Sequence, residues 1–160
     1  MTDYQARLDD GNTILTAYKM RQVEPSDLDI QPPSAQGTGR TAKELREELR
    51  ETAKEAARHS TGDETYGAAV YTDHNSIYSG SQLELPGEQR PAHALRVGIY
   101  KALSEGASEV SEVAVYSGTT RQIKICDSCK ELLKEFGTSG LNIRTIDNTG
   151  RERQYSLDEI

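Results

Sequence analysis

Apolar residues recur every three to four positions along residues 41–60, which predicts an amphipathic helix. Thr41 and Glu44 stand three residues apart at its beginning, which is the spacing of a capping box. The apolar side of this predicted helix consists of Leu45, Leu49, Ala53 and Ala56. Three pairs of opposite charge stand on the other side: Glu47–Arg50, Glu51–Lys54 and Glu55–Arg58. We therefore expect the charged side to be a solvated face of the helix.

Shorter apolar runs after residue 60 predict strands that alternate with two further helices. In chain order we predict a hairpin of strands 67–72 and 76–81, a helix over 92–105, a strand over 112–118, a helix over 127–136, a strand over 141–147, and an edge strand with a closing turn in 150–160. This order predicts an α/β fold, in which a central mixed sheet carries helices on both faces.

The N-terminal quarter of the chain differs in composition from the rest. The stretch QPPSAQGTG (31–39) is rich in Pro, Gly, Ser and Gln, which is typical of a linker. We expect residues 1–40 to be an N-terminal extension and linker that is either disordered or binds another subunit or a protein partner. Residues 41–160 are expected to form the folded domain.

Length and charge limit the classes of function that the chain can have. Its 160 residues suffice for one domain with a core, and its net charge is −7. An acidic chain lacks the excess of Lys and Arg that binds a phosphate backbone, so we do not expect nucleic-acid binding. We find no apolar run long enough to span a membrane and no signal peptide at the beginning, and therefore expect a cytoplasmic protein.

Three residues have the chemistry and spacing of metal ligands. Cys126 and Cys129 stand in a C-x-x-C spacing at the beginning of one predicted helix, and His93 stands at the beginning of another. A helix N-terminus stabilises a thiolate, and this spacing lets two sulfur atoms face one zinc ion. Three ligands leave a fourth position for water, as in catalytic zinc sites. A redox pair or two packed thiols are the alternatives, and we expect His59 and His74 to lie at the surface.

Several motifs agree in order and spacing with one known family. They are YGAAV (66–70), IYSGSQLE (77–84), HALRVGIYKALSEG (93–106) and ICDSCKELLKEF (125–136). In these motifs the chain resembles the cytidine deaminase superfamily, in particular the small cytidine- and blasticidin-type nucleoside deaminases. The signature of that superfamily is H-x-E…P-C-x-x-C, in which one His or Cys and two Cys bind zinc while the Glu transfers protons. The resemblance implies a three-layer α/β/α cytidine-deaminase-like fold of about five strands, with Zn²⁺ on His93, Cys126 and Cys129.

The chain departs from the family's pattern at residues that carry the chemistry. Leu95 stands at the position of the proton-transferring Glu, which leaves no catalytic residue there. Gln82 stands where the family has an Asn that contacts the ribose, although Glu84 is kept, so the resemblance implies that Gln82 and Glu84 bind the substrate. Glu64 stands near a position where the family often has an aromatic residue that stacks on the base.

Leu95 decides what we expect of the activity. Hydrolytic deamination needs a group that moves protons between water, the ring and the departing amine, and such help is worth about 10²–10⁴-fold in rate. Leucine cannot provide it, and Leu95 shares a helical stripe with Ile99 and Ala102, as a core residue would. Glu64 or Glu88 could replace the missing carboxylate, although a surface position is the ordinary expectation for both.

Three hypotheses about function follow. The first is a catalytically impaired pseudo-deaminase that binds zinc and a pyrimidine nucleoside-like small molecule, and acts in ligand binding, regulation or assembly. The second is an active, divergent deaminase that hydrolyses cytidine, deoxycytidine or a modified nucleoside to the uridine form and ammonia. The third is a scaffold whose zinc is structural and whose residues 1–40 contact a partner. The resemblance also implies a homo-oligomer, either a dimer or a tetramer.

Overall fold

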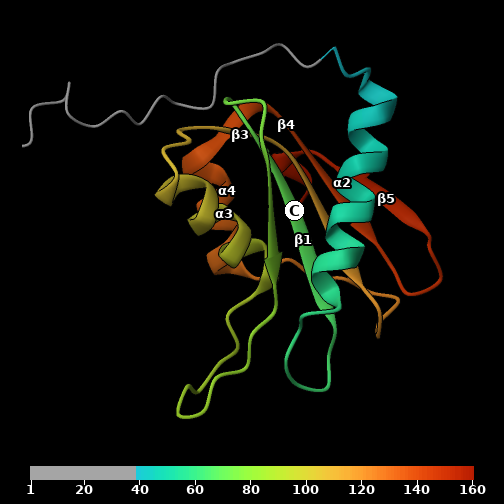
Figure 1. Ribbon diagram of the computed structural model, residues 1–160, viewed down its shortest axis with the longest axis vertical. Helices are drawn as coiled ribbons and strands as arrows, with labels where there is room; N and C mark the ends of the chain where they lie inside the picture. Colours follow the sequence, from blue (N-terminus) through green and yellow to red (C-terminus); the bar gives the residue numbers. More distant parts are fainter. Residues whose placement is uncertain (1–38) are drawn as a thin grey trace, which may run out of the picture. The chain divides into compact units, whose positions relative to one another are not determined.

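The computed structural model describes residues 39–160. The prediction of a partner-binding or disordered extension over residues 1–40 therefore falls, except for its last two residues, outside the described residues. The elements are α2 (Ala42–Ala57), β1 (Tyr66–Thr72), β2 (Ile77–Ser81), α3 (Ala94–Ser104), β3 (Val110–Ser117), α4 (Asp127–Phe136), β4 (Gly137–Ile146), β5 (Glu152–Tyr155) and the 3-10 turn η1 (Leu157–Glu159). Figure 1 shows the sheet with helices packed against it. None of these helices is long and apolar enough to cross a membrane.

The five strands form one mixed sheet in the order β2-β1-β3-β4-β5. β3 and β4 are parallel, and every other neighbouring pair is antiparallel. β1 and β2 form the predicted hairpin, and Asn75 in its turn adopts a φ of 55°, which Asn tolerates better than most residues. The predicted α/β fold with a mixed sheet of about five strands is confirmed.

α2 covers one face of the sheet through small side chains. Leu49 and Ala53 of α2 are fully buried against Ala69 of β1. Gly67 faces the same helix, and a Cβ atom at this position would lie 2.0 Å from the carbonyl oxygen of Ala53. The absence of a side chain at Gly67 therefore lets the backbone of α2 lie directly on β1.

α3 and α4 cover the opposite face, which holds the larger apolar core. Val70, Val113 and Ile143 from three adjacent strands meet Ile99 of α3 and Leu133 of α4 there, and all five are at most 1% exposed. Full burial of one such side chain stabilises the fold by about 1.5–3 kcal/mol. This face therefore supplies most of the hydrophobic stabilisation, and it also positions the beginnings of both helices.

Gly80 of β2 is the counterpart of Gly67 on the α3 side. A Cβ atom at Gly80 would lie 2.1 Å from the carbonyl oxygen of Ala94 and 2.4 Å from the backbone nitrogen of Gly98. The first turn of α3 therefore rests on the backbone of β2. This contact fixes the place at which α3 begins, immediately after His93.

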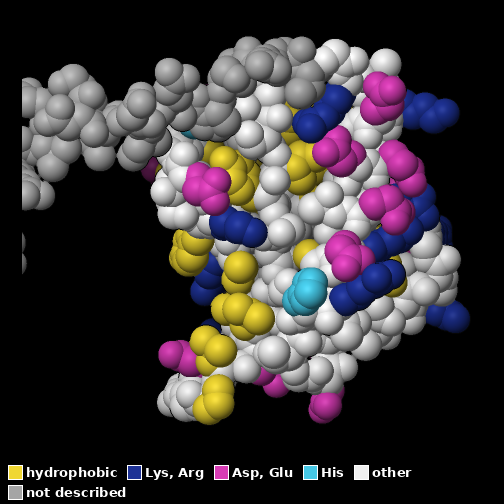
Figure 2. Space-filling view, viewed as in Figure 1, with side chains coloured by type: hydrophobic (Ala, Val, Ile, Leu, Met, Phe, Trp, Pro, Cys, Tyr) yellow, Lys and Arg dark blue, Asp and Glu magenta, His cyan; other side chains and the backbone are white. Residues whose placement is uncertain are grey.

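The outer side of α2 is solvated, as the charge pattern predicts. Two of the three predicted pairs form, Lys54–Glu51 at 2.8 Å and Arg58–Glu55 at 3.0 Å. Acidic and basic side chains are intermixed over this side of the molecule (Figure 2). Within residues 39–160, Glu47 and Arg50 do not pair, and the Arg50 guanidinium extends toward Gly150 in the β4–β5 turn. Exposed pairs of this kind contribute roughly 0.2–1 kcal/mol at most.

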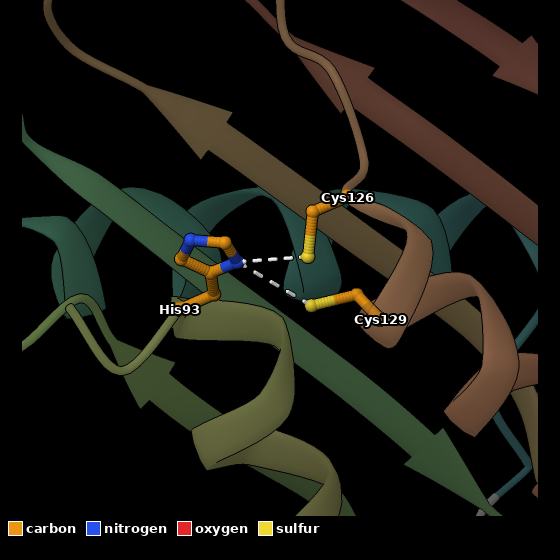
Figure 3. Close-up of side chains that lie close together, drawn as sticks. All are labelled: His93, Cys126 and Cys129. Carbon is orange, nitrogen blue, oxygen red and sulfur yellow. Dashed lines mark hydrogen bonds between the residues drawn. The ribbon is translucent and has the colours of Figure 1, made fainter. Parts of the chain in front are cut away.

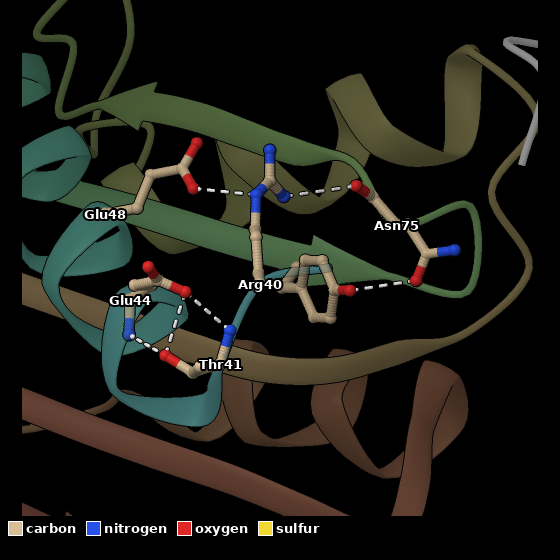
Figure 4. Close-up of polar contacts among 6 residues, drawn as sticks. Arg40, Thr41, Glu44, Glu48 and Asn75 are labelled. Carbon is tan, nitrogen blue, oxygen red and sulfur yellow. Dashed lines mark hydrogen bonds and ion pairs between the residues drawn. The ribbon is translucent and has the colours of Figure 1, made fainter. Parts of the chain in front are cut away.

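The beginning of α2 is capped and tied to the β1–β2 turn (Figure 4). The Thr41 hydroxyl accepts a hydrogen bond from the backbone N–H of Glu44 at 3.2 Å, and the Glu44 carboxylate accepts one from the backbone N–H of Thr41 at 2.7 Å. Arg40 pairs with Glu48 at 3.0 Å and donates to the backbone oxygen of Asn75 at 3.4 Å. The capping box predicted from Thr41 and Glu44 is confirmed.

β4 begins at Gly137, and the prediction that this strand starts at residue 141 is wrong. α4 ends at Phe136, so the chain passes from helix to strand with no loop between them. A Cβ atom at Gly137 would lie 2.3 Å from the carbonyl oxygen of Leu133, so glycine permits this abrupt change of direction. The apolar pattern begins only at Leu141 because the preceding strand residues are partly or fully exposed. The predicted edge strand and closing turn at the C-terminus are present as β5 and η1.

Candidate metal centre

His93, Cys126 and Cys129 come together at the beginnings of two neighbouring helices. His93 immediately precedes α3 and Cys126 immediately precedes α4, and both have extended backbone. Neither side chain caps its own helix, so the imidazole and the thiol are free to point toward each other. Cys129 lies in the first turn of α4, where its sulfur reaches the same place.

The three ligand atoms are close enough to hold one metal ion. The Nδ1 atom of His93 lies 3.0 Å from the Sγ atom of Cys126 and 3.7 Å from the Sγ atom of Cys129 (Figure 3). All three atoms lie within 4.8 Å of one another. Zn–N and Zn–S bond lengths of about 2.0 and 2.3 Å place the ligand atoms of a tetrahedral site about 3.3–3.8 Å apart. The donor set and its spacing therefore fit Zn²⁺, as predicted from the sequence.

The two thiols differ in their electrostatic surroundings. Burial opposes ionisation of Cys126, but hydrogen bonds from Ser128, Cys129 and His93 outweigh it and lower its pKa to about 6. Burial raises the pKa of Cys129 to about 12, with a further increase from the neighbouring Cys126 and an opposing effect of the Arg96 charge. Cys129 is only 2% exposed, so a cation beside its sulfur is needed for it to ionise. A divalent ion bound by both sulfurs meets this need.

Arg96 joins the two helices beside the ligands. Its guanidinium donates a hydrogen bond from α3 to the Ser128 hydroxyl on α4. The same hydroxyl lies 3.3 Å from the Sγ atom of Cys126. This bridge holds the two helix beginnings together and thereby keeps the ligand atoms in reach of one another.

The metal ligands open into a pocket of about 200 Å³. Its polar walls include Glu64, Gln82 and Lys124 in addition to the three ligands. Its apolar walls are formed by Ala94, Leu95, Val115, Ile123 and Ile125, with Tyr66 at one side. A concave, partly apolar pocket with a few convergent polar groups is typical of a small-molecule site.

The two predicted substrate-binding residues are placed differently. Gln82 is 5% exposed and lines the pocket. Glu84 lies outside the pocket, on an exposed segment, with its carboxyl group packed beside Gly62. Its backbone exchanges hydrogen bonds with the Thr61 hydroxyl at 2.6 and 3.1 Å. The structure therefore brings Gln82, but not Glu84, to the metal ligands.

The two carboxylates that the sequence offers as acids in place of a Glu at position 95 are also separated. Glu64 lines the pocket of the metal ligands. Glu88 lies in the exposed β2–α3 loop and lines two shallow surface hollows outside the pocket. Leu95 is 4% exposed and forms part of the pocket wall while packing into the core.

Tyr66 and Lys124 are pocket residues that sequence reasoning did not single out. Burial raises the pKa of Tyr66, and the negative charge of Glu64 raises it further, while a hydrogen bond with Ser117 acts in the opposite direction. Tyr66 opens β1 and Lys124 lies two residues before Cys126, so both adjoin motifs that were recognised. Their nearness to those motifs is the only sequence signal for them.

Comparison with known proteins places this site in a family. Residues 43–145 match the family model described as the cytidine and deoxycytidylate deaminase zinc-binding region. Two relatives named cytidine deaminase, from Halalkalibacterium halodurans and Sporosarcina psychrophila, are 30% and 29% identical over 94 residues. The matched region is 59% of this chain and 71% and 69% of those relatives.

Solved structures share the fold. The cytidine deaminase of Burkholderia pseudomallei has a TM-score of 0.63 at 24% identity, covering 69% of this chain and 91% of that one. The cytidine deaminase of Mycobacterium leprae has a TM-score of 0.56 at 20% identity, covering 68% and 92%. The family match spans more than half of the chain and contains all three metal ligands. The chain therefore belongs to the family defined by the cytidine and deoxycytidylate deaminase zinc-binding region.

Proposed function

We propose that the protein is a zinc-dependent deaminase that hydrolyses the exocyclic amine of a pyrimidine nucleoside, such as cytidine or deoxycytidine. The observation that carries this proposal is the opening of a three-ligand metal site into a small pocket. Three protein ligands are typical of a catalytic zinc site, whereas a closed structural site has four. The relatives named cytidine deaminase support a pyrimidine nucleoside as the substrate.

The pocket residues can bind and shield one ring. Bound zinc would supply a water molecule acidic enough to act as a nucleophile near neutral pH. The Gln82 amide offers both donors and an acceptor to a polar ring edge or a sugar, and Val115 and Ile123 form apolar walls beside it. At about 200 Å³ the pocket is smaller than the roughly 300–1,000 Å³ that encloses a drug-sized ligand. It therefore suits the base, with the rest of a nucleoside outside.

A second candidate function rests on Leu95. This buried leucine occupies the wall beside the metal ligands, at the position where the family signature has its proton-transferring Glu. A site without that carboxylate would bind zinc and a nucleoside-like ligand without turning it over. The protein would then act by ligand binding, regulation or assembly, as a pseudo-deaminase.

One set of measurements separates these functions. Zinc content, nucleoside binding, and ammonia release from cytidine and deoxycytidine are measured for the wild type, Cys129→Ser, His59→Asn and Leu95→Glu. His59→Asn is the matched control, because His59 is an exposed residue outside the metal centre. The proposal requires one zinc per chain and turnover in the wild type and in His59→Asn, with both lost in Cys129→Ser.

Two other results would favour a pseudo-deaminase or a scaffold instead. Turnover by Leu95→Glu alone would contradict the proposal and establish the pseudo-deaminase. Zinc binding without nucleoside binding or turnover in any variant would leave only a scaffold with structural zinc.

A further inference from the structure

Deamination requires two proton movements that Leu95 cannot perform. A bond forms between the water oxygen and C4 of the ring, and the bond between C4 and the amine nitrogen breaks. One proton of the water goes to ring nitrogen N3, and its other proton goes to the amine, which departs as ammonia and leaves the oxygen on C4 as a carbonyl. A single carboxylate can accept and return these protons, provided that it faces the pocket. The side chain of Leu95 has no atom that can do so.

Glu64 is the only carboxylate that lines the pocket among residues 39–160. Its neighbour Asp63 does not line it, and Glu84 and Glu88 lie on exposed segments elsewhere. The reaction requires a carboxylate in the pocket, and Glu64 is the residue that provides one.

The segment that carries Glu64 is held at both ends. Before Glu64, the backbone N–H of Thr61 donates to the backbone oxygen of Gln82 at 3.0 Å. After Glu64, the backbone oxygen of Thr65 accepts from the N–H of Gly118 at 3.0 Å. A Cβ atom at Gly118 would lie 2.5 Å from the Thr65 hydroxyl oxygen, so the two segments pass as closely as glycine allows. The segment of Glu64 is thus anchored between Gln82, which follows β2, and Gly118, which follows β3.

Ser60 adds a third anchor to this segment. Its hydroxyl donates to the backbone oxygen of Tyr66 at 2.7 Å and accepts from the N–H of Tyr66 at 3.0 Å. The loop between these residues is therefore closed upon itself, with Glu64 in its short exposed part. Glu64 lines the same pocket as the half-buried Tyr66 side chain, and its negative charge adds to the burial that raises the pKa of Tyr66.

We infer that Glu64 is the proton-transferring carboxylate of this site, supplied by the α2–β1 segment in place of the first turn of α3. This inference rests on the proposed function and assigns the acid–base step to a residue outside the family signature. The zinc ligands and the carboxylate then come from different segments that line one pocket, the beginnings of α3 and α4 and the α2–β1 segment. A deaminase lacking the signature Glu can in this way retain its chemistry.

The test compares Glu64→Gln with Asp63→Asn in the zinc-loaded, full-length protein. Both substitutions remove one negative charge from neighbouring exposed positions and keep the shape of the side chain, but only residue 64 lines the pocket. We expect kcat for cytidine to fall by about 10²–10⁴-fold in Glu64→Gln, with KM, zinc content and melting temperature unchanged. Asp63→Asn should match the wild type in all four.

Each outcome decides the question. A wild-type kcat in Glu64→Gln, or an equal fall in both variants, would overturn the role of Glu64 while leaving the proposed function intact. A fall in Glu64→Gln that appears in KM alone would assign Glu64 to substrate binding and overturn its role in proton transfer. No turnover in the wild type would overturn the proposed function and this inference together.

Discussion

On each face of the sheet, a glycine lets the backbone of one helix lie directly on a strand, but the two contacts have different consequences. On one face, α2 crosses Gly67 in its C-terminal half and packs on small side chains, and its outer side is mostly charged. On the other face, α3 crosses Gly80 at its first turn, so its beginning is left facing the pocket. α4 also begins beside that pocket. The part of the helix that contacts the sheet therefore matters for function. The metal ligands lie at the beginnings of α3 and α4, and none lies in the middle of a helix.

The largest expected effect is a loss of zinc affinity, and we expect it only from substitutions on the α3–α4 face of the sheet. Cys129→Ser removes a ligand atom and should weaken zinc binding by more than the roughly 100-fold typical of losing an outer partner. Competition with a zinc-chelating dye measures this affinity. His59→Ser, at the end of α2, should leave it unchanged, and an equal loss in both variants would contradict the assignment of the site to the α3–α4 side.

The two glycines test the comparison directly. Gly67→Ala and Gly80→Ala each place a Cβ atom within about 2 Å of a helix backbone oxygen, so each should destabilise the fold by about 3 kcal/mol or more. Urea unfolding measures this change. Only Gly80→Ala should also weaken zinc binding by the folded protein, because the displaced carbonyl belongs to Ala94, next to His93. Equal zinc affinity in the two variants would show that the first turn of α3 is not fixed by this contact.

A smaller change in stability is expected when the buried arginine on the α2 side of the sheet is replaced. Arg144 is 3% exposed and lies 3.2 Å from the Glu112 carboxylate and 3.4 Å from that of Glu152. Arg144→Met leaves Glu112 half-buried without its partner and should destabilise the fold by about 1–3 kcal/mol. Lys54→Met, which breaks an exposed pair, should change stability by less than about 0.5 kcal/mol in the same urea unfolding experiment.

The smallest effect concerns the beginning of α2. Thr41→Ala removes the hydroxyl that accepts the N–H of Glu44 and should destabilise the fold by about 1 kcal/mol without affecting zinc binding. Thermal unfolding at pH 7 measures the change. Unaltered stability would mean that water caps α2 equally well.

The same cap predicts a dependence on pH. Hydrogen bonds from the backbone N–H and then the hydroxyl of Thr41 hold the pKa of Glu44 below its ordinary value. A carboxylate with a lowered pKa in the folded state contributes stability that is present above its unfolded pKa of about 4.3 and is lost as the pH falls through the folded value. The stability difference between wild type and Thr41→Ala should therefore shrink below about pH 4. A difference that grows there would contradict this linkage.

Local sequence patterns predicted most of the fold because its elements are periodic and end with recognisable residues. The helix over 41–60 follows from its apolar stripe and from Thr41 and Glu44, and the structure ends it at Ala57. The beginning of β4 was missed because Gly137 to Gly140 offer no apolar alternation, whereas Gly137 already pairs with Val110 of β3. Strand pairing between distant segments overrides local preference at such positions.

The candidate site was predictable only where it depends on local spacing. Cys126 and Cys129 are brought together by one helical turn, and His93 by a family motif. Glu64 and Glu84 could not be placed from the sequence, because their positions depend on hydrogen bonds between the α2–β1 segment and residues far along the chain. The resemblance assigned Glu84 to substrate binding and the sequence offered Glu64 only as a substitute acid, and of these two Glu64 is the one that lines the pocket.

Gly67 and Gly80 also have a mechanical consequence. They stand on neighbouring strands, one register position apart, and face opposite helices. At this place three layers of backbone are stacked with no side chain between them. Side chains can absorb a displacement by changing rotamer, whereas backbone in van der Waals contact has no such freedom. The layers should therefore be stiffest here, and the backbone at Ala94, next to His93, rests on the hydrogen-bonded sheet before any ion binds. Little ordering entropy then remains to be lost when the metal binds.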